Sequence, residues 1–199
     1  YAEELGYRIK LLGIARRKEK GYELRVHPTL VPSKRLIASV EGAMNAVLVK
    51  GDAVGATLYY GAGAGAEPTA SAVIADLVDV TRMHTADPEH RVPHLAFQPD
   101  QLSDLPALPI GDVVTSYYLR MRVDDKPGVL ADITRILADR EISIDAMIQK
   151  EPSEGEMQTD IILLTHRSIE RNVVDAIAKV EALPTVRGPV VRIRLENLA

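Results

Sequence analysis

The chain has 199 residues, of which 46% are hydrophobic and 26% charged, with a formal net charge of −4, and this composition is ordinary for one or two soluble globular domains. The 24 Lys and Arg and the 28 Asp and Glu are spread over both halves, so neither half offers the basic face that nucleic-acid binding requires. The chain lacks cysteine, which excludes disulfides and zinc–thiolate sites and favours the cytoplasm, and it lacks the run of roughly 18–20 apolar residues that a membrane span needs.

The first twelve residues predict an amphipathic helix. Leu5, Ile9 and Leu12 recur at helical spacing, with charged residues mostly on the other side. Tyr1 is not a methionine, and a helix already under way at the first residue indicates a fragment of a longer protein.

The next segment is typical of a β-hairpin. Two β-prone runs, 14–18 and 22–28, flank a turn that contains Gly21. The first run and the turn carry a basic cluster, which could recruit an anion or could form a solvated edge that discourages further strand pairing. The cluster consists of Arg16, Arg17, Lys18 and Lys20.

Two further strands are expected at 45–50 and 56–60, around a turn in which Asp52 has a turn role rather than a catalytic one. With a helix over 68–82 on one face of the sheet, these elements predict an α+β layer. The opposite face or an edge would be free to pair with a second copy.

A glycine-rich loop precedes that helix. Gly61, Gly63 and Ala66 fit the G-x-G-x-x-A form of the dinucleotide fingerprint. A complete nicotinamide-binding domain would continue with another buried strand, and none follows, so we interpret the loop as half of a site. The alternative is a glycine turn that only lets the helix pack closely on a sheet.

Residues 83–115 are expected to form a linker. They hold five of the twelve prolines and three of the five histidines, His84, His90 and His94. None of these histidines has a histidine or carboxylate four residues away on a predicted helix, so we expect no metal site.

From residue 116 the pattern predicts the order βαββαβ, a ferredoxin-like arrangement with both helices on one face of a four-stranded sheet. Leu119, Met121 and Val123 mark the first strand by alternation, and Ile133 and Leu137 lie on one helix face. The uncovered sheet face and edge predict self-association. The remaining elements are expected at 142–148, 157–165, 169–183 and 191–195.

Residues 124–133, DDKPGVLADI, resemble the D-x-P-G-V-L-x-x-I signature of ACT domains, small modules that bind amino acids at a dimer interface. The resemblance implies a pocket where the first strand turns into the first helix, against the second strand of a partner. It implies that Asp125 meets the amino group of the effector, that the N–H groups of Gly128, Val129 and Leu130 meet its carboxylate, and that Ser143 and Ile144 form the facing wall. Alternatively, Pro127 and Gly128 only start a helix that Asp125 caps.

Residues 1–82 resemble the C-terminal part of the catalytic and dimerisation domain of bacterial homoserine dehydrogenase. The matching stretches are YAEELGYRIKLLGIA, VEGAMNAVLVKGDAVG and YYGAGAGAEPTASAVIADLV. The resemblance implies that Gly65 approaches an NAD or NADP cofactor, with Gly63 and Glu67 as neighbours. The cofactor domain and the catalytic lysine and aspartate of the family have no match here, so no catalytic residue is expected in this chain, and no cofactor is expected to bind to it alone.

The expected organisation is therefore a partial catalytic and dimerisation domain at 1–82 with a mixed sheet, the linker at 83–115, and an ACT regulatory domain at 116–199. The first hypothesis is a homoserine dehydrogenase fragment that forms homo-oligomers and carries feedback regulation, with threonine as effector, in threonine, methionine and isoleucine biosynthesis. The alternatives are a stand-alone amino-acid sensor and a purely structural dimerisation module.

Overall fold

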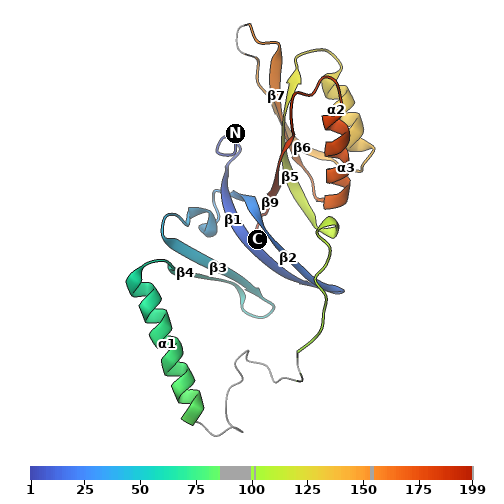
Figure 1. Ribbon diagram of the computed structural model, residues 1–199. Helices are drawn as coiled ribbons and strands as arrows, with labels where there is room; N and C mark the ends of the chain where they lie inside the picture. Colours follow the sequence, from blue (N-terminus) through green and yellow to red (C-terminus); the bar gives the residue numbers. More distant parts are fainter. Residues whose placement is uncertain (86–99, 101, 153–154, 199) are drawn as a thin grey trace. The chain divides into compact units, whose positions relative to one another are not determined.

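A computed structural model describes residues 1–85, 100, 102–152 and 155–198. Its backbone divides into two compact units (Figure 1). The first unit combines residues 1–38 with 105–199, and the second comprises residues 39–104. No helix among the described residues is both long and apolar enough to cross a membrane.

The first unit opens with a long β-hairpin. Strands β1 (Tyr7–Lys18) and β2 (Gly21–Pro32) pair antiparallel along their whole length. The predicted hairpin is confirmed, but the helix predicted over residues 1–12 is wrong. Residues 2–6 form turns, and the chain is extended from Tyr7 onward, because pairing with β2 satisfies its backbone groups and overrides the helical spacing of the leucines.

The remainder of this unit has the predicted βαββαβ order. Strands β9, β5, β7 and β6 lie side by side in that order, and every pairing among them is antiparallel. A two-residue strand, β8 (Ser168–Ile169), adds a short pairing to the start of β5. The main elements are β5 (Val114–Asp124), α2 (Val129–Ala138), β6 (Ile144–Gln149), β7 (Gln158–Thr165), α3 (Glu170–Glu181) and β9 (Val191–Leu195).

The main core lies between this sheet and its two helices. Leu119, Met121 and Val123 of β5 are almost fully buried there, together with Ile133 and Leu137 of α2. Alternation on the strand and helical spacing on α2 thus point the apolar side chains to one shared layer. The ferredoxin-like fold predicted for this region is confirmed.

The face of the sheet opposite the two helices is partly covered by the start of the chain. A second core cluster on this side contains Tyr118, Ile162 and Leu164, and Leu5 and Tyr7 from the start of the chain pack against it. The start of the chain is also tied to the sheet by an ion pair from Lys150 to Glu4 at 2.7 Å. The N-terminal segment therefore covers part of the face that was expected to be free.

The hairpin extends the sheet. Strand β2 pairs with the outer edge of β9 in parallel, through Thr29↔Arg194 and Leu30↔Leu195, so a seven-stranded sheet runs from β1 to β6. The strands at 45–60 do not join this sheet, because they pair only with each other.

The second unit contains the two-stranded sheet of β3 (Met44–Gly51) and β4 (Gly55–Ala62), followed by α1 (Ala66–Thr85). The two strands and the helix start at the glycine loop are confirmed. The described side chains of α1 are exposed, except the half-buried Pro68 and Met83. The expectation that this helix covers one face of the sheet is therefore wrong for the described residues. Two short 3₁₀ turns, at Leu36–Ser39 and Ile110–Asp112, complete the described structure.

Candidate effector site

The loop between β5 and α2 exposes the start of a helix. Gly128 is the N-cap of α2 with φ of +93°, in the left-handed region that favours glycine, and no side chain caps the helix. The first turn of a helix presents N–H groups without intrahelical partners, and these suit a carboxylate. Val129 is buried and Leu130 is half-buried, so a ligand at this turn would meet its backbone rather than these side chains.

Asp125 lies in the same loop, and its side chain is exposed. Its backbone N–H donates a hydrogen bond to the carbonyl of Met157 at 2.9 Å, which holds the loop against the start of β7. The alternative in which Asp125 caps α2 is wrong, because the N-cap is Gly128 and the helix has no side-chain cap. The loop thus offers an anionic side chain next to a helix N-terminus that has no side-chain cap, where the N–H of Val129 makes a long hydrogen bond of 3.4 Å to the carbonyl of Lys126.

Asp124, which sequence reasoning missed, fastens this loop. It is buried, and it accepts hydrogen bonds from Arg187 Nε at 2.7 Å and Nη2 at 2.8 Å and from Lys126 Nζ at 3.1 Å. The hydrogen bonds from Arg187 and then Lys126 lower the pKa of Asp124 to about 2. Backbone hydrogen bonds from Asp124 to Thr185 and from Arg187 to Arg122 run alongside. No local pattern links Asp124 to a partner 63 residues away, so this pair could not be predicted from the sequence.

Ser143 and Ile144 lie at the other end of the sheet. Along β7, Asp124 pairs with Gln158 whereas Ile144 pairs with Thr165, a difference of seven residues or roughly 24 Å. Ser143 is exposed, and its carbonyl accepts a hydrogen bond from the N–H of His166. Within one chain, the structure therefore does not bring the expected facing wall to the loop.

The glycine loop in the second unit brings Gly63, Gly65 and Glu67 into one short segment. Gly65 has φ of +128° and directly precedes α1, and its carbonyl accepts a hydrogen bond from the N–H of Thr69. A Cβ at Gly63 would lie 2.2 Å from Asn45 Nδ2, so a larger residue there would displace the exposed Asn45 side chain. Glu67 is exposed in the first helical turn.

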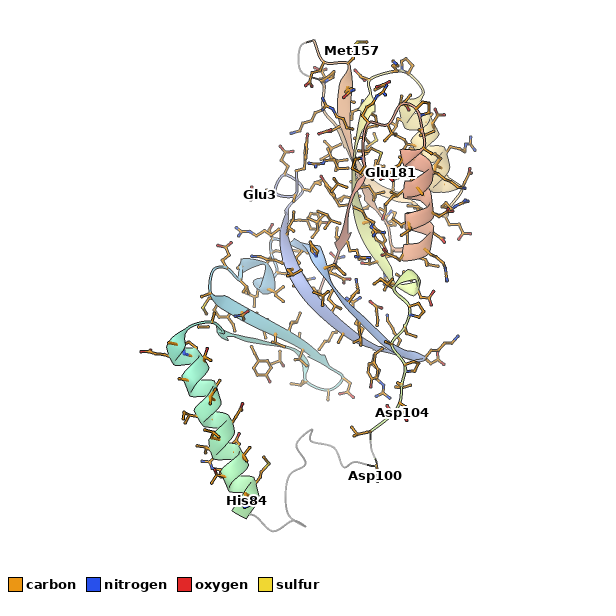
Figure 2. All side chains as sticks on the ribbon, viewed as in Figure 1. Glu3, His84, Asp100, Asp104, Met157 and Glu181 are labelled. Atoms are coloured by element: carbon orange, nitrogen blue, oxygen red, sulfur yellow. The ribbon has the colours of Figure 1, made fainter. Side chains whose placement is uncertain are left out.

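The remaining candidates do not assemble into a site. Among the three histidines, His84 lies in the last turn of α1 (Figure 2), whereas His90 and His94 fall outside the described residues. The described residues contain no group of three or more His, Asp or Glu that could hold a metal ion. An open groove of about 450 Å³ lies along α3 and contains none of the predicted site residues. It is lined by Val174, Ile177, Ala178, Glu181, Val190 and Arg192.

Two family models match the chain. The model described as Homoserine dehydrogenase matches residues 1–78, and the model described as ACT domain matches residues 117–183. The residues between the two matches, 79–116, contain five of the twelve prolines.

Relatives and solved structures agree with these matches. Homoserine dehydrogenase from Pseudomonas aeruginosa is 64% identical over 198 residues, covering 100% of this chain and 46% of its own length. The Helicobacter pylori protein of the same name is 41% identical, covering 99% of this chain and 45% of its own length.

The crystal structure of a homoserine dehydrogenase from Thiobacillus denitrificans matches with a TM-score of 0.91 and 75% identity, over 100% of this chain and 44% of that one. A Staphylococcus aureus homoserine dehydrogenase structure at pH 6.0 gives a TM-score of 0.58 at 25% identity, over 98% of this chain and 43% of that one. The chain spans less than half the length of each of these relatives. It belongs to the homoserine dehydrogenase family, corresponds to the C-terminal part of such proteins, and carries an ACT domain in its second half.

Proposed function

We propose that this chain is the dimerisation and regulatory part of an NAD(P)-dependent homoserine dehydrogenase, which interconverts L-homoserine and L-aspartate 4-semialdehyde in threonine, methionine and isoleucine biosynthesis. One observation carries the proposal: the same chain matches the dehydrogenase family over residues 1–78 and the ACT family over residues 117–183. We take 1–82 and 116–199 as the two domains, with 83–115 between them. The cysteine-free composition supports a cytoplasmic enzyme.

The glycine loop contributes to the cofactor site of the parent enzyme but does not form it alone. Gly65 adopts a backbone conformation that favours glycine and begins a helix, which suits a close approach to a bound dinucleotide, with Gly63 and Glu67 beside it. A cofactor domain outside this chain would hold most of the NAD or NADP. Because the catalytic lysine and aspartate are not matched in this chain, we expect no hydride transfer by these 199 residues alone.

The ACT domain binds an amino-acid effector, and we propose threonine. Its ammonium group would meet Asp125, and its carboxylate would meet the N–H groups of Gly128, Val129 and Leu130. The exposed carboxylate of Asp125 and the uncapped start of α2 support this orientation.

A second copy completes the pocket. The outer edge of β9 is partly occupied by β2, whereas β6 is the last strand at the other end of the sheet. If two β6 strands pair antiparallel across a two-fold axis, the start of one strand lies beside the end of the other. Ser143 and Ile144 of the partner then lie beside Gln149, at the end of the sheet that carries the β5–α2 loop. There the backbone carbonyl of Lys150 accepts a hydrogen bond from the hydroxyl of Thr159.

Isothermal titration calorimetry of the chain with threonine, isoleucine, methionine and serine tests the site. We expect threonine to bind, and we expect Asp125→Ala to weaken that binding at least tenfold, because it removes the partner of the ammonium group. Asp132→Ala is the matched control, since it removes an exposed carboxylate from the same end of α2.

Heats equal to those of buffer for all four amino acids would leave only a structural dimerisation role. Light scattering at micromolar concentration should give a dimer or a higher oligomer, and a monomer would contradict the shared pocket.

A further inference from the structure

Strand β9 and the residue after it carry three charged side chains at alternate positions, which point to one face of the sheet. We call these residues, Arg192, Arg194 and Glu196, the β9 charge row. Each of them forms an ion pair with another element of the first unit. The row therefore connects elements on both sides of β9.

The two arginines hold the start of α3. Arg192 Nη1 lies 2.8 Å from Glu170 Oε1, and Arg194 donates to both carboxylate oxygens of Glu170 at 2.6 and 2.8 Å. Glu170 is only 3% exposed and also accepts a hydrogen bond from Tyr117 Oη at 2.7 Å. Burial alone would raise the pKa of Glu170, but the hydrogen bonds from Arg194 and Tyr117 outweigh it and lower that pKa.

Glu196 holds the hairpin. Its carboxylate lies 2.6 Å from Arg25 Nη2 on β2 and 2.5 Å from Arg16 Nη2 on β1. The Arg25 side chain is only 1% exposed, so its charge depends on its partners. Glu23 Oε1 also lies 2.7 Å from Arg25 Nη2, but that oxygen has no hydrogen bond of good geometry, which leaves Glu196 as the aligned carboxylate partner.

The backbone link between the hairpin and β9 is short by comparison. The parallel register covers Thr29↔Arg194 and Leu30↔Leu195, and the N–H of Glu196 donates to the carbonyl of Leu30. Two register pairs give little resistance to separation, so the attachment also depends on the core cluster that Leu30 and Leu195 share and on keeping the buried ion pairs intact.

We propose that the β9 charge row is a joint that makes α3 and the β1–β2 hairpin open and shift as one body. Helix α3 belongs to the segment that matches the ACT family, and the hairpin belongs to the segment that matches the dehydrogenase family. The joint is thus the place where a displacement in the ACT domain enters the dehydrogenase segment. This inference concerns the coupling alone and does not require an effector to bind.

Hydrogen–deuterium exchange on charge-neutral variants tests the joint. We expect Glu196→Gln to accelerate exchange of the β2 amides on the order of 100-fold, because it removes the only carboxylate that is aligned to accept a hydrogen bond from the buried Arg25 among the described residues and leaves the poorly aligned Glu23. Glu19→Gln is the matched control, since Glu19 is an exposed glutamate in the turn of the same hairpin. Equal exchange in the two variants would overturn the proposal.

Glu170→Gln tests the transmission across β9. It removes the charge that anchors Arg192 and Arg194, so β2 should again exchange faster even though the side-chain partners of Glu170 are Tyr117 and these two arginines rather than residues of the hairpin. An effect confined to α3 and β5 would show that the row does not connect the two elements.

A measurement on the unaltered chain tests the proposal even if the variants fail to fold. In native-state exchange at increasing denaturant, the β2 amides and the β9 amides should open with the same free energy and the same denaturant dependence. If β2 opens separately and earlier, the joint is absent. No amino acid is added in these experiments, so their outcome is independent of the effector proposal.

Discussion

The two compact units of this chain differ in how they bury their side chains. The first unit has two core clusters, in which residues such as Leu163 and Ile133 are fully buried. In the second unit, none of the described side chains within residues 39–84, 100 and 102–104 is fully buried, and α1 exposes a series of large apolar residues. These are Val73, Ile74, Leu77, Val78 and Val80.

The difference shows which part of the chain can supply its own stability. A two-stranded sheet and a single helix bury too little apolar surface to be stable alone in water, whereas a sheet covered by two helices buries a continuous core. The first unit therefore sets the stability of the chain, and substitutions should have unequal effects in the two units.

Truncation of a core leucine should have the largest effect. Leu163→Ala in β7 removes a fully buried side chain, and we expect a loss of about 3 kcal/mol in the free energy of unfolding measured with urea. Leu77→Ala in α1 changes a leucine that is 57% exposed and should stay within about 0.5 kcal/mol. Similar losses at the two sites would contradict the contrast between the units.

Removal of a buried hydroxyl should have an intermediate effect. Tyr117→Phe deletes the hydrogen bond to the Glu170 carboxylate and should cost about 1.5–3 kcal/mol, the range for hydrogen bonds to charged groups. Tyr60→Phe in β4 is the control, because that tyrosine is 57% exposed, and it should be near neutral. If thermal unfolding shows no difference between the two variants, the Glu170 cluster does not stabilise the first unit.

Acid should weaken the first unit through Asp124. The folded-state pKa of about 2 lies below the usual value of 3.8, so this carboxylate stabilises the fold above pH 4 and loses its contribution as the pH falls toward 2. The stability difference between the unaltered chain and Asp124→Asn should therefore be constant near neutral pH and shrink between pH 4 and pH 2. A difference that does not change with pH would show that Arg187 does not lower this pKa.

The ACT half could be predicted from the sequence almost element by element. Its strands alternate, its helices have apolar faces, and the segment around Pro127 and Gly128 marks a helix start, so each signal lies within a short window. The loop residues Asp125, Gly128 and Val129 could be placed for the same reason.

The remaining features depend on contacts between distant residues. The β1 segment has helical spacing, but it is a strand because β2 pairs with it, and the parallel pairing of Thr29 with Arg194 joins residues 165 positions apart. The Asp124–Arg187 pair has the same character. Apolar spacing in α1 also suggested a covered helix, although its described side chains are largely exposed.

The first unit is discontinuous in sequence, since residues 39–104 interrupt it between β2 and the segment that leads to β5. Every strand of the seven-stranded sheet comes from outside that interruption. The interrupting stretch can therefore diverge or lengthen in evolution without removing a strand from the larger sheet.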